Sequence, residues 1–231
     1  MGPLLAERLR QRVRINGSSP LLTYYDLDSG ERTELSAISF CNWVNKTSNL
    51  LVDELAVDQG DVISMPLALE APGHWLTAAW QVACWQVGLA VDLTNPSTSA
   101  AVVTGPQWQE YGKRELYACA LHPLGFGFAE PLPPGIHDYA IEVRRHADQF
   151  FGEAPNADAT AWIDPERTLN QADLINIDGA AARRLVRAGD PWCTVRDGVM
   201  TALVTGGSAV VVVGGDAAQL ARLAQSERVA T

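Results

Sequence analysis

Two glycine pairs enclose the most apolar stretch of this sequence and are the first candidates for a phosphate site. Gly206-Gly207 precedes the run 209–213, which is one alanine followed by four valines, and Gly214-Gly215 closely follows it. Because Asp216 then opens a segment with a helical pattern, free backbone N–H groups at that point could hold a phosphate. The pattern lacks the spaced glycines of a dinucleotide fingerprint and the lysine of a phosphate loop. Ordinary turns therefore explain these glycines better.

The histidines and cysteines do not match a known catalytic or metal-binding pattern. The histidines are scattered over different predicted elements, and no serine or cysteine stands in the strand–turn–helix setting of a hydrolase nucleophile. Each cysteine stands alone, without a C-x-x-C pair or a histidine at ligand spacing. These residues are His74, His122, His137, His146, Cys41, Cys84, Cys119 and Cys193. We therefore assign no catalytic, cofactor-binding or metal-binding residue, and we expect neither disulfides nor zinc.

The composition is that of a globular protein with an acidic surface. Of the 231 residues 47% are hydrophobic, and 27 acidic against 17 basic residues give a formal net charge of −10. Such a surface repels a nucleic-acid backbone. The densest basic run, 8–14, has apolar residues between its arginines, which is typical of the solvated face of a helix. No apolar run is long enough to cross a bilayer, and the N-terminus lacks the apolar core of a secretion signal. The sequence thus predicts no nucleic-acid or membrane partner and a cytoplasmic location.

Alternating helix and strand patterns predict an α/β fold with mixed, largely parallel sheets flanked by helices. Apolar residues spaced by three or four mark helices at 36–55, capped by Ser36, and from Pro72 to Gly88. Short apolar runs indicate buried parallel strands. The expected strands are 62–65, 89–93, 100–104, 116–121, 159–163 and 209–213, with a hairpin formed by 21–26 and 31–35. The other expected helices lie within 1–19, 137–150, 169–188, 199–204 and 217–224.

A proline- and glycine-rich connection divides the chain. The stretch 122–135 holds four prolines and three glycines around Phe126 and Phe128, two aromatic residues that we expect to pin this long loop to the core. We therefore predict a first α/β subdomain at 1–121, a connection at 122–156, and a second, incomplete α/β subdomain at 157–231.

Several stretches carry a family resemblance. They are Leu21-Leu22-Thr23-Tyr24, the helix 40–55, the turn 57–62, and 79–96 with its ending Gly88-Leu89-Ala90-Val91-Asp92-Leu93-Thr94-Asn95-Pro96. In order and spacing they resemble the N-terminal part of AMP-forming acyl-CoA synthetases and their adenylate-forming relatives. The C-terminal third is similar to the part that follows the nucleotide loop of that family. There a helix, here 169–188, precedes a proline–aromatic turn, here Pro191-Trp192, and the part ends in a Glu-Arg-Val-Thr-like sequence, here 227–231. The resemblance implies the α/β fold of that family.

The residues that carry the chemistry of the family are absent. Its phosphate loop is rich in threonine, serine and glycine and ends in lysine, whereas the corresponding segment 158–168 has neither glycine nor lysine. The turn Pro191-Trp192-Cys193 lacks the aromatic-histidine of the acyl pocket. The chain also stops before the adenine-binding and metal-binding motifs, the hinge and the mobile C-terminal domain. In these respects it resembles the short, synthetase-like proteins of actinobacteria.

Two functional hypotheses follow. The first is a non-catalytic relative, a pseudoenzyme with a binding or interaction role and no cofactor. The alternative is a ligase-like enzyme that works with a partner chain or binds a nucleotide or acyl group. Segment 158–168 favours the first, because Asp158, Asp164 and Glu166 outnumber Arg167 and oppose a polyphosphate. We also predict a homo-oligomer or a protein partner, since a truncated scaffold would expose a face of the sheet that contains 209–213.

Overall fold

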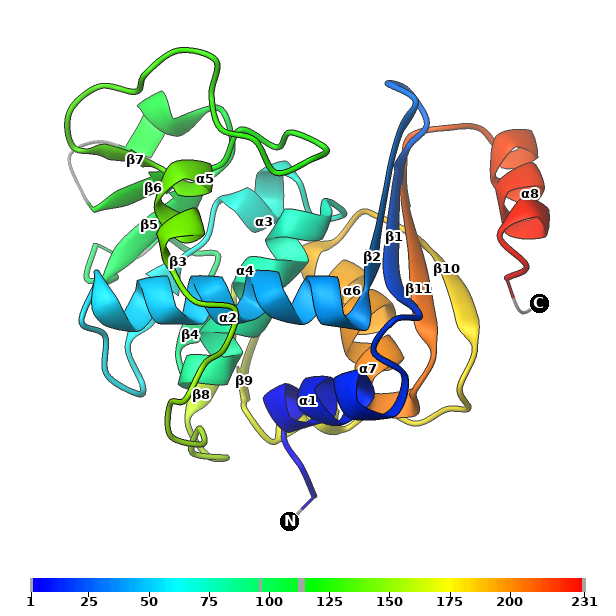
Figure 1. Cartoon of the computed structure of the whole chain (residues 1–231), viewed down its shortest axis with the longest axis horizontal. Coiled ribbons are helices and arrows are strands. Elements are labelled where there is room, and N and C mark those ends of the chain that lie inside the picture. Colours follow the sequence, from blue (N-terminus) through cyan, green and yellow to red (C-terminus); the bar gives the residue numbers. More distant parts are fainter. Residues whose placement is uncertain (1, 96, 112–114, 230–231) are drawn as a thin grey trace.

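The computed structural model consists of two sheets with helices packed between and around them (Figure 1). It describes residues 2–95, 97–111 and 115–229. In spatial order the seven-stranded sheet contains β7 (Ile136–Asp138), β6 (Leu116–Ala118), β5 (Ala101–Thr104), β3 (Val62–Ser64), β4 (Ala90–Asp92), β8 (Thr160–Asp164) and β9 (Arg167–Asn170). The four-stranded sheet contains β10 (Arg183–Arg187), β11 (Ser208–Val213), β1 (Pro20–Asp26) and β2 (Glu31–Ser36).

The pairing of these strands is mostly parallel. Only the hairpins β1–β2 and β8–β9 are antiparallel among the described strand pairs. The predicted neighbours β3, β4 and β5 pair in parallel, with Ile63 opposite both Val91 and Ala101. This confirms the predicted fold class of mixed, largely parallel sheets flanked by helices.

Four of the described α-helices have ten residues or more, and the other four have four or five. These α-helices are α1 (Leu5–Asn16), α2 (Ala37–Asp53), α3 (Leu67–Glu70), α4 (Trp75–Val87), α5 (Tyr139–Glu142), α6 (Pro191–Val195), α7 (Thr201–Thr205) and α8 (Ala217–Ser226). A π-helical turn, Arg196–Met200, joins α6 to α7, and short 3-10 turns occupy Trp108–Tyr111, Val143–Arg145 and Asp173–Ile175.

Helix α4 is the centre of the core. His74 caps its first turn, because its Nδ1 accepts a hydrogen bond from the Leu76 N–H at 3.2 Å. Gly88 ends it with a φ of 90°, a left-handed conformation that glycine adopts without strain. Along its length only Ala78 is not buried, so the helix is enclosed on nearly its whole circumference and lies between other elements. Helix α2 packs against it, after the Ser36 cap that the sequence predicts.

One predicted helix is wrong, and another is shorter than predicted. The segment 169–188 contains the end of β9, a 3-10 turn and the whole of β10, because Arg183–Arg187 pair in parallel with β11. Gly179, whose φ is 149°, interrupts what reads as a helical pattern. In 137–150 the helical part ends within Val143–Arg145, and β7 takes the first residues.

The two sheets do not follow the three segments expected from the sequence. Strand β8, from the third segment, pairs with β4, from the first. Conversely, β1 from the first segment pairs with β11 from the third, with Leu22 opposite Ala209 and Asp26 opposite Val213. The chain thus forms β1 and β2 of the four-stranded sheet, then the whole seven-stranded sheet, and returns to the four-stranded sheet with β10 and β11.

The valine strand β11 is covered on both faces by this same chain. Val210 and Val212 pack with Leu223 of α8, while Ala209 and Val211 belong to the main core. The exposed face that motivated the expected self-association is therefore not present, and self-association itself stays a prediction.

Pro96, Ala230 and Thr231, which belong to the resembling segments, lie outside the described residues. No helix in the described ranges has the length and apolar character to cross a membrane.

Candidate functional site

The segment that would have to hold phosphates is a tight hairpin. Asp164, the last residue of β8, pairs with Arg167, the first of β9, so the turn consists of Pro165 and Glu166. The Asp164 Oδ1 accepts hydrogen bonds from the backbone N–H groups of Glu166, at 2.8 Å, and Arg167, at 2.9 Å. The amides that could approach an anion at this turn are thus already bound by a carboxylate of the chain.

The second carboxylate oxygen of Asp164 is fixed from inside the protein. Its Oδ2 accepts a hydrogen bond of 2.6 Å from the Trp162 indole Nε1. The Trp162 side chain is completely buried and contacts the rings of Trp85 and Trp192, with ring centroids 6.4 and 5.3 Å away. Asp164 therefore ties the turn to a row of tryptophans that links β8 to α6.

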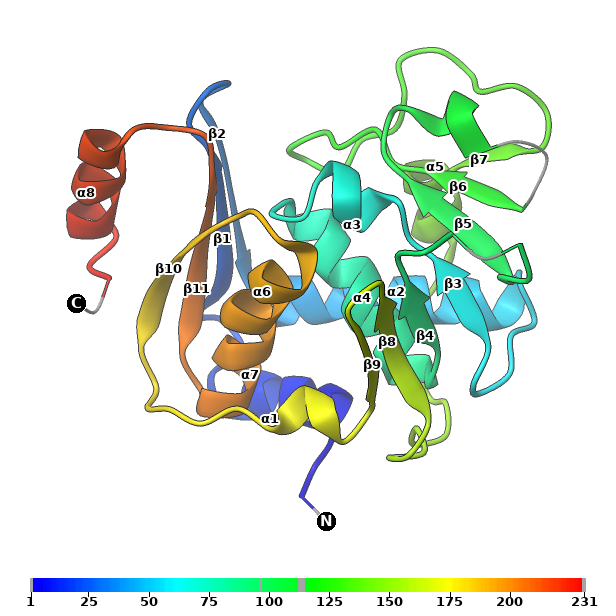
Figure 2. The ribbon, with the colours of Figure 1, turned by 180° about the vertical axis from the view of Figure 1, so that it is seen from behind.

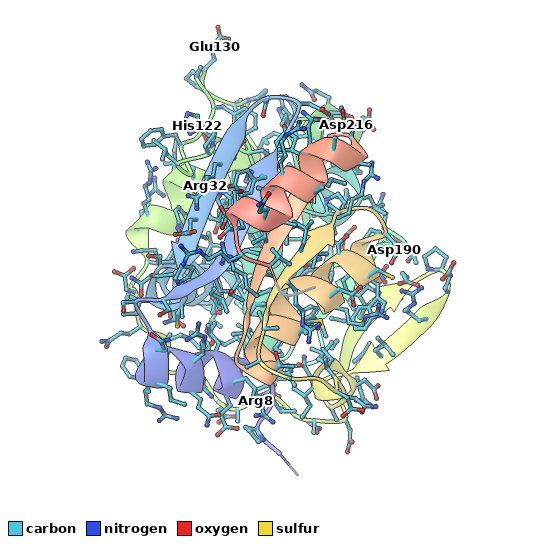
Figure 3. The ribbon with its side chains drawn as sticks, turned by 90° about the vertical axis from the view of Figure 1, so that its right-hand side faces the viewer. Arg8, Arg32, His122, Glu130, Asp190 and Asp216 are labelled. Carbon is cyan, nitrogen blue, oxygen red and sulfur yellow. The ribbon has the colours of Figure 1, made fainter. Side chains whose placement is uncertain are left out.

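The single cation of the hairpin is surrounded by acids. The Arg167 guanidinium lies 3.5 Å from Asp164 Oδ2, 2.5 Å from Glu166 Oε2 and 3.8 Å from Asp190 Oδ1. Figure 3 shows Asp190 at the start of α6, on the side of the hairpin. Asp158, which the sequence analysis counted among the opposing charges, precedes β8 and so lies at the other end of that strand. The third carboxylate near Arg167 is instead Asp190. No sequence signal indicated Asp190, because this residue follows β10 in the other sheet.

These side chains line a small cavity at the carboxyl ends of β4 and β8. Its volume is about 220 Å³, and its lining consists of Leu69, Leu93, Asp164, Pro165, Glu166, Arg167, Asp190 and Pro191. Ligands of open α/β sheets bind outside the carboxyl ends of the strands, so this position is where a ligand is expected. Three carboxylates against one guanidinium make it unsuited to a polyphosphate.

A carboxylate of the chain also occupies the topological switch point at the carboxyl end of the same sheet. The connection from β3 leads to β4 on one side, whereas β5 lies on the other side of β3 and leads on to β6, which creates a topological switch point. There Glu70 of α3 accepts hydrogen bonds from the Thr104 hydroxyl at 2.7 Å, the Gly105 N–H at 3.1 Å and the Tyr111 hydroxyl at 3.3 Å. An anionic ligand would have to displace Glu70.

At the starts of α6 and α8 a carboxylate of the chain likewise accepts a backbone N–H. Asp190 accepts a hydrogen bond of 2.8 Å from the Cys193 N–H, which lowers the pKa of Asp190, and the same carboxylate raises the pKa of the Cys193 thiol. Asp216 accepts a hydrogen bond of 2.7 Å from the Gln219 N–H, and the Gln219 side chain accepts one from the Asp216 N–H. The glycines before α8 thus form a turn that ends in a reciprocal cap.

The structure does not bring the histidines or cysteines together. His74 is buried and caps α4, and its pKa is lowered to about 4 because burial disfavours the charged ring. The other histidines lie beside different partners, His122 against Phe126, His137 at Glu115 and His146 at Asp53. The four cysteines are free thiols. Among the described residues no group of three or more histidine, cysteine, aspartate or glutamate side chains could hold a metal ion.

Comparison with known proteins shows the family of this chain. No family model matches the sequence. A protein of Mycobacterium tuberculosis, described as a TIGR03089 family protein, is 33% identical over 233 aligned residues, which cover 94% of this chain and 92% of that protein. The chain belongs to the TIGR03089 family. As a TIGR03089 family protein it thus has a curated relative that it matches over nearly the full length of both.

Solved structures similar to this TIGR03089 family protein are acyl-CoA synthetases and ligases. An acyl-CoA synthetase of Brucella canis has a TM-score of 0.74 at 14% identity, covering 99% of this chain and 46% of that one. The N-terminal domain of FACL13 from Mycobacterium tuberculosis has a TM-score of 0.68 at 14% identity, covering 99% and 62%. The anthranilate CoA ligase AuaEII has a TM-score of 0.66 at 12% identity, covering 97% and 47%. The chain thus has the fold of their N-terminal domains and spans about half the length of the synthetase and ligase chains.

Proposed function

We propose that this protein is a non-catalytic member of the adenylate-forming fold group, with a binding or interaction role in the cytoplasm. The observation that carries the proposal is the Pro165-Glu166 turn, whose neighbouring amides donate to Asp164. Activation of a carboxylate by ATP requires the triphosphate to be held in line with the attacking oxygen by donors that are in place before the reaction. Here those donors hold a side chain of the protein, and the adjacent charges are mostly negative.

Other carboxylates that accept hydrogen bonds from backbone amides argue against a phosphate site elsewhere in this chain. Glu70 occupies the switch point, and Asp190 and Asp216 occupy the starts of α6 and α8. The hairpin turn, the switch point and the starts of α6 and α8 are therefore each occupied by a carboxylate of the chain. A nucleotide would have to displace one of them and would bring further negative charge to a protein of net charge −10.

The test is an assay of pyrophosphate release from ATP with fatty and aromatic acids, with and without magnesium and coenzyme A. We expect none above background. A thermal-shift screen with ATP, AMP, coenzyme A and acyl chains accompanies it, because a ligand at a hundred times its dissociation constant stabilises by about 2.7 kcal/mol. Acid-dependent release that Arg167→Ala abolishes would overturn the proposal and favour the ligase-like alternative. Arg10→Ala, an exposed arginine of α1, is the matched control.

A further inference from the structure

Strand β10 is an open edge of the four-stranded sheet. Its partner in the sheet is β11, in parallel register from Arg183 opposite Ser208 to Arg187 opposite Val212 (Figure 2). The Ala188 N–H donates to the Val212 carbonyl and the Ser208 N–H donates to the Ala182 carbonyl. In a parallel ladder alternate residues bond to the same neighbour, so the even-numbered residues of β10 face β11. The N–H and C=O groups of Arg183, Leu185 and Arg187 therefore point outward.

The helices on the two faces of the sheet extend beyond this edge. A groove of about 690 Å³ runs along β10. On one side it is lined by Ala224 and Val229, from α8 and the residues after it, and on the other by Arg196 and Thr201, from the helical segment that includes α6 and α7. Figure 3 shows β10 between these two helical segments. The floor of the groove is thus a strand edge, and its walls are the layers above and below the sheet.

The outward edge is rich in arginine. Arg183 is paired with Glu227, Arg184 donates to the Ala180 carbonyl at 3.1 Å, and Arg187 is exposed. The acidic residues that line the groove are Asp197, which is bound by Arg196 at 2.7 Å, and Asp178. An edge with free backbone groups and a surplus of arginine complements an extended chain with acidic side chains.

We propose that β10 is a docking edge for an extended acidic segment of a partner protein, which adds a fifth strand to the four-stranded sheet. The proposal rests on the interaction role proposed above and names its surface. Backbone hydrogen bonds to Arg183, Leu185 and Arg187 hold the segment, and its side chains alternate between the α8 wall and the Thr201 wall. Acidic residues of the segment meet Arg184 and Arg187.

A second copy of the same edge fits less well. A two-fold axis at Leu185 in an antiparallel pair would put Arg183 of each copy opposite Arg187 of the other. Like charges directly opposite each other destabilise a strand pair. The charge pattern thus favours an acidic partner over a symmetric dimer through β10.

The experiment uses a fluorescein-labelled hexapeptide of alternating glutamate and valine, with anisotropy as the readout. We expect saturable binding to the full chain, weakened by salt, and none for the lysine–valine peptide. Leu185→Pro removes an outward N–H, together with a side chain that packs against the cluster under α8, and leaves the ladder to β11 intact. The lost N–H should lower the affinity about tenfold. Leu185→Ala, which keeps the N–H, is the matched control and retains the binding.

A charge test keeps the proposal falsifiable if the proline variant does not fold. The double variant Arg184→Glu and Arg187→Glu should abolish binding, whereas Arg10→Glu on α1 should not. Absence of saturable binding, or binding that both edge variants leave unchanged, overturns the proposal. A concentration-dependent dimer that Leu185→Pro dissociates would assign the edge to a second copy instead. Pyrophosphate release is measured on the same preparations, so catalysis with intact peptide binding would overturn the proposed function alone.

Discussion

Asp164 should be the most sensitive acidic residue of the hairpin. Replacement by alanine removes the acceptor of the Glu166 and Arg167 amides and of the buried Trp162 indole. The turn amides can bond to water, so their loss costs little. The indole N–H cannot, and a buried donor left without a partner costs about 1–3 kcal/mol. With the lost charge-assisted bonds we expect Asp164→Ala to lower the free energy of unfolding by about 3 kcal/mol.

Urea denaturation followed by tryptophan fluorescence measures this loss, because Trp162 contacts Trp85 and Trp192. The midpoint should fall while the slope of the free energy against urea stays unchanged. Asp164→Asn keeps one acceptor oxygen and should lose about 1 kcal/mol. Glu166→Ala, at the exposed side of the same turn, should change the stability by less than about 0.5 kcal/mol. A loss in Asp164→Ala no larger than in Glu166→Ala would refute the role assigned to the carboxylate.

Two further predictions concern pH. Burial lowers the pKa of His74 from 6.5 to about 4, so the unfolded chain takes up a proton first and the free energy of unfolding falls by about 3 kcal/mol as pH drops from 6.5 to 4. His74→Asn keeps a helix cap and should flatten the dependence of the free energy of unfolding on pH, measured by urea denaturation, whereas His122→Asn should not. The same pH dependence in the His74→Asn variant and the wild type would contradict the assignment. Burial opposes the ionised Glu227, but hydrogen bonds from Tyr25 and Arg183 lower its pKa below 4.5, so its contribution is present above pH 4.5 and is lost at lower pH. Glu227→Gln should lower the protection factors of the α8 amides at pH 7, as acid does in the wild type, while Glu130→Gln is the neutral control. Unchanged protection of α8 would contradict the role assigned to Glu227.

Local patterns were enough for the elements whose neighbours agree with them. The spacing in α2 and α4, with the Ser36 cap and the Gly88 end, and the short apolar runs of β3, β4 and β5 predicted these elements directly. The segment 169–188 failed because Leu174, Leu185 and Ala188 keep a helical spacing although β10 is held by pairing with a distant strand. Tertiary contacts decide such a segment, and no window of sequence contains them.

In the candidate site, too, some features follow from the local sequence and others only from tertiary contacts. The absence of glycine and lysine at 158–168 is a local fact, and the sequence suffices to read it. That Asp164 binds the turn amides, and that Asp190 from the other sheet completes the acidic surroundings of Arg167, depends on how the hairpin and α6 meet. Geometry of this kind has no sequence signature.

The pairing of β1 with β11 sets the order of events during synthesis. Strand β1 lies in the interior of its sheet, yet its parallel neighbour is the last strand of the described chain. On the ribosome the β1–β2 hairpin must wait, with one edge unpaired, until residues 208–213 have emerged. Contacts between such distant segments slow folding and expose apolar strands to aggregation. We therefore expect chains truncated before β11 to need a chaperone, and the full chain to complete its smaller sheet last.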